Sequence, residues 1–363
     1  KAREMMSLFV KERVETGRIY FMNIDHCNQR SAWNDDIKMT NLCVEVLHPT
    51  TPLQHTDDKD AEIGICILSA INVLEIQSDA EMEKVCDIIV RILDQLIDYQ
   101  DYFLPAAENF TKNRRSLGIG ITNFAAYLAK AGVKYTDDEA PNVADELMEK
   151  VQYYLLSSSC NIASEKGKCP KYHKTKYSQG WLPIDTYKKE IDEFVTRKNS
   201  MDWEGLRERI KEHGLRHSTV SAIMPCESSS VIQCSTNGIE PIRSYITYKK
   251  SKARTLPVIV PNYSSLKNKY TLAYEMEDNV GLIKIVGALQ KWVDMSISAN
   301  MYYNYEHYEN GALPDSKVIK EILLAYKLGW RTGYYNNTDD GDKQSSSGEE
   351  QVEDGCESGA CAL

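Results

Sequence analysis

Hydrophobic side chains recur at helical spacing in several long stretches of the chain. Near the start of residues 80–99, for example, Met82, Val85 and Ile89 lie three and four positions apart, as on one face of a helix. Asp202 and Gly214 flank another such stretch, and these residue types commonly cap helix ends. We therefore predict amphipathic helices over residues 80–99, 142–166, 202–213 and 315–328.

Strand-like runs lie between these helices. Thr219–Met224 is a short run of β type, and a further short segment ends at Tyr334-Tyr335. Helix-then-strand alternation favours an α/β fold with parallel strands, although periodicity alone does not separate a closed barrel from an open sheet. Residues 338–363 contain almost no large apolar side chains, so we predict a folded domain over 1–337 and a disordered tail over 338–363.

Charge and hydropathy narrow the function classes. The formal net charge of -10 argues against a general nucleic-acid or membrane-surface binder, so a phosphate-bearing ligand would be held by local donors. No apolar run is long enough for a membrane span. The N-terminal Lys1–Met5 stretch has no apolar signal region and no initiator Met, from which we expect a piece of a longer chain.

The ten cysteines do not require a disulfide framework in a chain of this size without a secretion signal. Free cysteines are commonly buried as small hydrophobic residues. We expect this of Cys86, Cys160 and Cys234.

The Asn41-Leu42-Cys43-Val44-Glu45 stretch carries candidate chemistry. In an extended chain the amide, thiol and carboxylate lie on one face, roughly 7 Å apart at successive steps. A half-buried strand with its polar face in water is the alternative. The nearby carboxylate is expected to raise the pKa of the Cys43 thiol by like-charge repulsion. That hinders thiolate catalysis but suits a thiol that loses a hydrogen atom.

Two further segments accompany this motif. Cys66 lies in the strand-like run 64–72, from which a second thiol could face the first. The Pro225-Cys226-Glu227-Ser228-Ser229 stretch follows the 219–224 run. A loop that leads into a helix suits a phosphate, through N–H groups and the helix dipole. An ordinary serine-rich loop with a helix cap is the alternative.

Two pairs of residues near the C-terminus have possible redox uses. Tyr334 and Tyr335 are adjacent; tyrosine pairs usually pack, but a phenol can also lose an electron and a proton together. Cys356 and Cys361 lie in the predicted tail, where Ser358 and Gly359 permit the turn that disulfide closure needs. They suit a mobile dithiol that exchanges with another disulfide; a metal clip or a dispensable tail is the alternative.

Together these pieces resemble one family, the class I ribonucleotide reductase large (α) subunit of enterobacteria and their phages. The resemblance covers essentially the whole chain and its most distinctive piece is the terminal Cys-Glu-Ser-Gly-Ala-Cys. Other matching pieces are Thr16–Tyr20, Asp25–Asn28, Arg114–Gly120, Leu182–Lys189, Trp203–Pro225, Thr236–Pro241 and Ser296–Asn300.

The resemblance implies the C-terminal portion of a ten-stranded α/β barrel, with Cys43 on a loop at its centre. Cys43 would become a thiyl radical that takes the 3′ hydrogen of a ribonucleoside diphosphate. Glu45 would take the 3′ hydroxyl proton, and Asn41 would orient the ribose. Cys66 would be one of two thiols that supply the reducing equivalents.

The resemblance also implies binding and relay roles. Tyr335 and then Tyr334 would pass an oxidising equivalent from a metal-containing small (β) subunit, whose tail would dock near the helix at 315–328. Cys356 and Cys361 would re-reduce the active-site disulfide and be recharged by thioredoxin or glutaredoxin. The substrate diphosphate would be held by Pro225, Cys226, Glu227, Ser228 and Ser229.

Two departures from the family limit these expectations. Cys226 stands where the family usually has Ser or Thr, which puts one hydroxyl contact in doubt. The family's polypeptide is also much longer, and the thiol opposite Cys66 and the ATP and deoxynucleotide effector sites belong to an absent N-terminal half. We therefore expect a cytoplasmic protein that binds no metal or cofactor itself and does not turn over alone.

Three hypotheses follow. The chain is the catalytic portion of this reductase, or it is a glycyl-radical relative that shares the barrel, or it is an inactive remnant that serves as a thiol-redox or scaffold module. A glycyl-radical enzyme should have a C-terminal glycyl loop, whereas this chain ends in a dithiol. The retained Cys43, Glu45 and Tyr334-Tyr335 positions favour the reductase over a decayed remnant.

Overall fold

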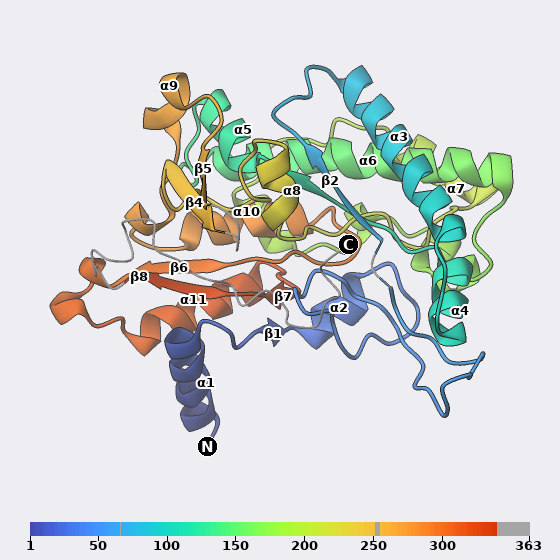
Figure 1. Ribbon diagram of the computed structural model, residues 1–363, viewed down its shortest axis with the longest axis horizontal. Helices are drawn as coiled ribbons and strands as arrows, with labels where there is room; N and C mark the ends of the chain where they lie inside the picture. Colours follow the sequence, from blue (N-terminus) through green and yellow to red (C-terminus); the bar gives the residue numbers. More distant parts are fainter. Residues whose placement is uncertain (66, 251–254, 340–363) are drawn as a thin grey trace.

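The computed structural model describes residues 1–65, 67–250 and 255–339 (Figure 1). Long helices surround a set of short strands. The α-helices are α1 (Ala2–Thr16), α2 (Ile24–Arg30), α3 (Asp79–Tyr99), α4 (Pro105–Arg114), α5 (Phe124–Ala131), α6 (Ala140–Lys166), α7 (Trp203–His213), α8 (Glu227–Ile232), α9 (Tyr263–Leu266), α10 (Val280–Gln290) and α11 (Asp315–Lys327). Short 3₁₀ turns lie mainly between α6 and α7 and after α9.

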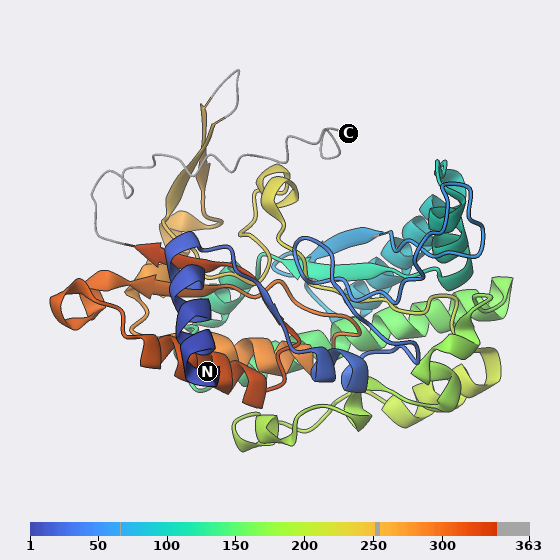
Figure 2. The same ribbon diagram turned by 90° about the horizontal axis from the view of Figure 1, so that it is seen from below.

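The strands of the described residues form two parallel and two antiparallel pairs. They are β1 (Phe21–Met22), β2 (Leu68–Asn72), β3 (Gly118–Thr122), β4 (Ile246–Lys250), β5 (Thr255–Ile259), β6 (Met301–Asn304), β7 (Thr332–Gly333) and β8 (Asn336–Asp339). β2 pairs with β3, and β6 with β8, in parallel. β1 pairs with β7, and β4 with β5, in antiparallel fashion; the β4–β5 hairpin projects from the body of the molecule (Figure 2).

Isolated bridges extend the parallel pairs into one series. Ile119 in β3 pairs with Ser221, and Ile223 pairs with Ile297, whose segment continues into β6. The order is therefore β2, β3, 221–223, 297–304 and β8. Among the described residues these segments do not close into a ring. Parallel order places the carboxyl ends of neighbouring segments at one edge, which is where ligands bind in α/β folds.

β3 lies inside this series, between β2 and the 221–223 segment. All five of its residues are buried, as expected for a parallel strand that is covered on both faces. A Cβ on Gly120 would lie 2.7 Å from the backbone oxygen of Ala222. The absence of a side chain there lets β3 approach the 221–223 segment closely.

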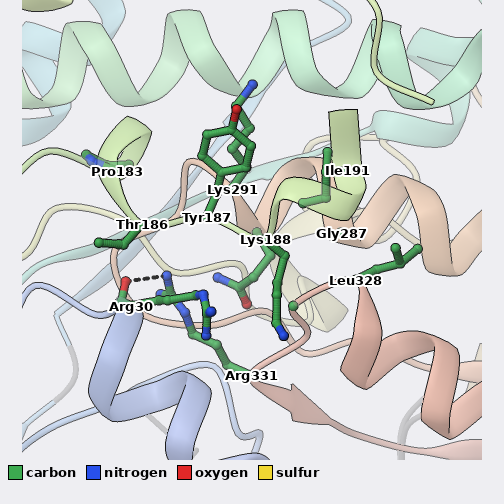
Figure 3. Close-up of a pocket in the computed structure, with 12 residues that line it drawn as sticks. Arg30, Pro183, Thr186, Tyr187, Lys188, Ile191, Gly287, Lys291, Leu328 and Arg331 are labelled. Carbon is green, nitrogen blue, oxygen red and sulfur yellow. Dashed lines mark hydrogen bonds between the residues drawn. The ribbon is translucent and has the colours of Figure 1, made fainter. Parts of the chain in front are cut away.

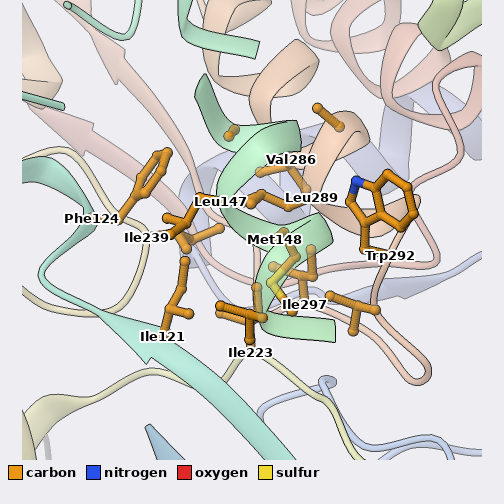
Figure 4. Packing of buried hydrophobic residues seen from close by; sticks show 14 of the residues in the cluster. Ile121, Phe124, Leu147, Met148, Ile223, Ile239, Val286, Leu289, Trp292 and Ile297 are labelled. Carbon is orange, nitrogen blue, oxygen red and sulfur yellow. The ribbon is translucent and has the colours of Figure 1, made fainter. Parts of the chain in front are cut away.

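The main core fills the space between the strands and the helices behind them. Figure 4 shows Ile121, Ile223 and Ile297 from the strand segments packed against side chains of α6 and α10. α6 is the central helix and contacts α3, α10 and α7. Within the described residues, no helix is both long and apolar enough to cross a membrane.

A smaller buried cluster supports the segment that contains Cys43. Val46 and Leu47 pack with Trp33, Cys27 and neighbouring residues. The indole N–H of Trp33 donates to the backbone oxygen of Leu47 at 2.7 Å, and Thr40 bridges Leu47 across the base of the loop. The ends of the 40–47 loop are therefore fixed.

The four helices predicted from periodicity are confirmed as α3, α6, α7 and α11, each within two residues of the expected bounds. Asp202 caps α7 by accepting from the Gly205 N–H at 2.9 Å. The Thr219–Met224 run contributes parallel bridges at residues 221 and 223 only. Of the tail predicted over 338–363, residues 338 and 339 belong to β8, and residues 340–363 lie outside the described residues.

Candidate active site

The Asn41–Glu45 segment is a turn, so the prediction of an extended strand with three side chains on one face was wrong. The Val44 N–H donates to the Asn41 carbonyl at 3.2 Å, and Val44 has a φ of 62°. Leu42, which an extended chain would place on the opposite, apolar face, is 73% exposed. The turn forms because burial of Val46 and Leu47 in the smaller cluster outweighs the local alternation of polar and apolar positions.

The turn brings the Asn41 and Glu45 side chains together. The Asn41 amide donates to Glu45 Oε1 at 2.9 Å, and its oxygen accepts from the Val46 N–H at 2.9 Å. The Glu45 carboxyl is almost fully buried. Burial raises its pKa above the ordinary value, although hydrogen bonds from Asn41 and Ser298 act in the opposite direction. A carboxyl with a raised pKa in a polar pocket suits proton transfer.

Ser298 links this carboxyl to the Cys43 backbone. Its hydroxyl lies 3.0 Å from Glu45 Oε2 and 2.6 Å from the Cys43 carbonyl oxygen. The Ser296 N–H also donates to the Glu45 carbonyl at 2.9 Å. The segment that precedes β6 therefore holds the turn from one side. Ser298 lies in the matching Ser296–Asn300 motif, but no sequence pattern predicted a role for it.

Cys43 contacts the predicted tyrosine pair. The Tyr334 hydroxyl donates to Cys43 Sγ at 3.4 Å, and the ring centroids of Tyr334 and Tyr335 lie 4.1 Å apart. Tyr334 is buried, and burial together with the bond to Cys43 raises the pKa of its phenol strongly. The phenol therefore stays protonated, and its loss of an electron is coupled to loss of the proton.

Tyr20 is a third phenol at this site. Its ring centroid lies 4.7 Å from that of Tyr334 and 5.3 Å from that of Tyr335. Burial and the hydrogen bond with Tyr335 raise the pKa of Tyr20. Tyr20 belongs to the matching Thr16–Tyr20 motif, but the motif predicts no function for it. The local sequence does not indicate a contact with residues more than three hundred positions away.

The predicted phosphate loop lies where the 221–223 segment leads into α8. The Cys226 thiol is buried and lies 3.7 Å from the Met224 carbonyl, and the Cys226 N–H donates to Asn237 Oδ1 at 2.6 Å. The Asn237 amide in turn donates to Glu227 Oε1 at 2.6 Å. The Cys226 side chain is thus directed inward, and any phosphate donors would come from the first turn of α8, which begins at Glu227.

The remaining predicted thiols divide into two groups. Cys66, Cys356 and Cys361 lie outside the described residues. Cys86 and Cys160 are buried as expected, whereas Cys234 is exposed, so that expectation was wrong; Cys234 follows the short helix α8 in a surface turn with φ 52°. Among the residues that the structure describes, no group of three or more His, Cys, Asp and Glu side chains could hold a metal ion.

A cavity elsewhere in the fold is lined by cations (Figure 3). Arg30, Lys188, Lys291 and Arg331 contribute to its wall, and Arg331 donates to the Arg30 carbonyl at 2.6 Å. Its volume of about 10 Å³ has room for about one water molecule. A nucleotide does not fit there.

Comparison with known proteins defines the family. Residues 1–336 match the family described as "Ribonucleotide reductase, barrel domain". The chain belongs to this family. This match confirms the α/β fold class and the relationship to the reductase barrel domain, both predicted from the sequence.

Three relatives illustrate the similarity. The chain is 47% identical over its whole length to ribonucleoside-diphosphate reductase 1 subunit alpha of Escherichia coli (strain K12), of which it covers 48%. It is 45% identical to subunit alpha of Haemophilus influenzae, with the same coverage. Over 94% of its length it is 40% identical to subunit alpha of Enterobacteria phage T4, of which it covers 45%. The chain thus spans about half the length of these relatives.

Proposed function

We propose that this chain is the catalytic portion of a class I ribonucleotide reductase large subunit and reduces ribonucleoside diphosphates to 2′-deoxyribonucleoside diphosphates through a thiyl radical. The observation that carries the proposal is the 3.4 Å contact between the Tyr334 hydroxyl and Cys43 Sγ. A thiol in contact with a buried phenol, whose ring lies against that of a second, partly buried phenol, is suited to hydrogen-atom transfer, since both bond partners are neutral and in contact.

The relay in this proposal runs from Tyr335 to Tyr334 to Cys43. A protein radical on the small subunit, generated by its metallocofactor, oxidises Tyr335. At each later step one electron and one proton move together from the reduced to the oxidised partner. Tyr334 becomes a phenoxyl radical as Tyr335 regains an electron and a proton. Cys43 then becomes a thiyl radical as Tyr334 regains an electron and a proton.

The sugar chemistry in this proposal uses the turn at residues 41–45. The Cys43 thiyl radical takes the 3′ hydrogen, Glu45 takes the 3′ hydroxyl proton, and Asn41 orients that edge of the ribose. The 2′ hydroxyl leaves as water. Cys66 and a second thiol supply two electrons and two protons, one proton for the water and one for the 2′ carbon, and become a disulfide. Glu45 returns its proton to the 3′ oxygen, and Cys43 returns the hydrogen to the 3′ carbon.

The other binding roles are also proposals. Pro225, Cys226, Glu227, Ser228 and Ser229 cradle the diphosphate, with the donors supplied by Glu227, Ser228 and Ser229 in the first turn of α8, because the Cys226 N–H already donates to Asn237. Cys356 and Cys361 carry reducing equivalents from thioredoxin or glutaredoxin to the active-site disulfide. Because these reductants keep thiols reduced in the cytoplasm, we propose a cytoplasmic location.

The partners in this proposal are the remaining half of the large subunit and the small subunit. The chain covers 48% of its Escherichia coli relative, and the second thiol and the effector sites are assigned to the other half. The small subunit's tail is assigned to α11, whose outer face exposes Leu323 and Tyr326. Exposed large apolar residues on one helix are typical of docking surfaces.

The test is Cys43→Ser in the reconstituted enzyme, which contains this chain, the remaining half of the large subunit and the small subunit. Deoxynucleotide formation should be lost, whereas Cys160→Ala, at a buried thiol on α6, should retain it. Activity in Cys43→Ser would refute the radical assignment. No activity in the unmodified complex would favour the alternative, an inactive remnant or a thiol-redox or scaffold module.

A further inference from the structure

A buried arginine stands behind the three tyrosines. Helix α1 lies beside α11 in both views of the molecule (Figures 1 and 2) and buries only two of its residues, Val10 and Arg13. The Arg13 side chain is 0% exposed. A fully buried arginine is unusual, so its contacts require a physical explanation.

The guanidinium of Arg13 binds the backbone on both sides of the tyrosine cluster. Nη1 donates to the Tyr334 carbonyl at 2.7 Å and to the Ile19 carbonyl, and Nη2 donates to the Tyr335 carbonyl at 3.4 Å. Ile19 directly precedes Tyr20. One side chain thus ties together the two chain segments that present the three phenols.

No carboxylate neutralises this cation within the described part of the chain. The acceptors of Arg13 are carbonyl oxygens, its Nε has no hydrogen-bond partner there, and the Phe21 ring centroid lies 5.2 Å from its central carbon. Burial lowers the pKa of Arg13 to about 10, so it remains charged near neutral pH. Lysine could not replace it fully, because only the planar guanidinium presents several donors in a fixed fork.

A buried positive charge also affects how a neighbouring phenol is oxidised. Removal of an electron alone would create a second cation beside Arg13, which Coulomb repulsion disfavours in a medium of low dielectric constant. Removal of an electron together with a proton leaves the phenoxyl neutral. The charge therefore favours coupled transfer over stepwise oxidation.

We propose that Arg13 is a positioning residue for the tyrosine relay, holding the backbones of Tyr334, Tyr335 and Ile19–Tyr20 so that the phenols stay in contact. This inference rests on the proposed reductase function. A displacement of about 1 Å at a reacting group can reduce a rate roughly a hundredfold, so loss of three backbone bonds is expected to slow the relay markedly.

The experiment compares Arg13→Gln, Arg13→Lys and the control Lys11→Gln in the reconstituted enzyme. Lys11→Gln removes a positive charge from an exposed position on the same helix. Arg13→Gln should lower kcat roughly tenfold or more, leave KM for the ribonucleoside diphosphate unchanged, and reduce the transient phenoxyl signal in electron paramagnetic resonance. The kcat and phenoxyl signal of Arg13→Lys should lie between those of Arg13→Gln and the unmodified enzyme. Lys11→Gln should match the unmodified enzyme in both.

The outcomes separate this inference from the proposed function. Unchanged kcat and phenoxyl yield in Arg13→Gln would overturn it, as would equal losses in kcat and substrate binding, which indicate a general structural role. If Arg13→Gln does not fold, Arg13→Lys decides: a normal relay rate there overturns the positioning role. Activity in Cys43→Ser would instead refute the function itself.

Discussion

The Ser298 hydroxyl offers a sharp test of the site, because it contacts both Glu45 and the Cys43 backbone. In Ser298→Ala the buried carboxylate loses a donor that lowers its pKa. A hydrogen bond to a charged group contributes roughly 1.5–3 kcal/mol, and one pKa unit corresponds to about 1.36 kcal/mol. The upper limit is therefore a rise of roughly two units in the pKa of Glu45.

A smaller shift is expected, for a structural reason. A serine hydroxyl has one hydrogen, and the Cys43 carbonyl, at 2.6 Å, competes for it with Glu45 at 3.0 Å. We therefore expect a rise of roughly one unit. Because the proposed role of Glu45 as a base requires its deprotonated form, the acid limb of the pH–rate profile should move to higher pH by that amount.

The assay is deoxynucleotide formation by the reconstituted enzyme as a function of pH. Ser218→Ala is a matched control, since Ser218 is also buried but its hydroxyl has no hydrogen-bond partner within the described structure. The control should keep the unmodified profile. An acid limb that stays in place in Ser298→Ala would show that the proton acceptor is not Glu45 or that Ser298 does not stabilise it.

Three further outcomes are expected. Tyr334→Phe keeps the ring but removes the hydroxyl that contacts Cys43, so turnover should be lost while substrate binding and the melting temperature stay nearly unchanged; measurable turnover contradicts the relay. Glu45→Gln removes a buried carboxyl whose pKa is raised by burial, so its charged form destabilises the fold above roughly pH 4.3. At pH 7 the substitution should therefore increase the unfolding free energy, measured in urea, by roughly 0.5–2 kcal/mol. It should also abolish turnover. Burial lowers the pKa of His48 to about 3, whereas the unfolded chain takes up this proton below roughly pH 6.5. Stability should therefore fall as the pH decreases from 6.5 toward 3, and His48→Gln should make that fall shallower in urea titrations.

Local pattern predicts much of the helical framework. α3 follows from its apolar spacing, and α7 from its spacing and from Asp202 and Gly214 at its ends. Helix–strand alternation also predicts parallel strands, as in β2–β3 and β6–β8, but not the antiparallel pairs or the strand order. The pairing of Ser221 and Ile223 with β3 and Ile297 depends on contacts far apart in the chain.

The geometry of the site is predicted less well from the local sequence. The alternation in Asn41–Glu45 resembles a strand, but burial of Val46 and Leu47 and the Trp33 bond to Leu47 impose a turn. Arg13 was missed for a similar reason. Its partners Tyr334 and Tyr335 lie more than three hundred residues away, and an isolated arginine in a polar helix looks like a surface residue. Only the family resemblance placed Tyr334 near Cys43 beforehand.

The central claim is hydrogen transfer between Cys43 and the 3′ carbon of the substrate. Its most direct test is turnover of a ribonucleoside diphosphate that carries deuterium at the 3′ carbon, with the reconstituted enzyme and mass-spectrometric analysis of the product. The account predicts slower turnover than with the unlabelled substrate, return of the deuterium to the 3′ position, and no product in Cys43→Ser. Product formed at the same rate from both substrates, or formed by Cys43→Ser, would contradict it.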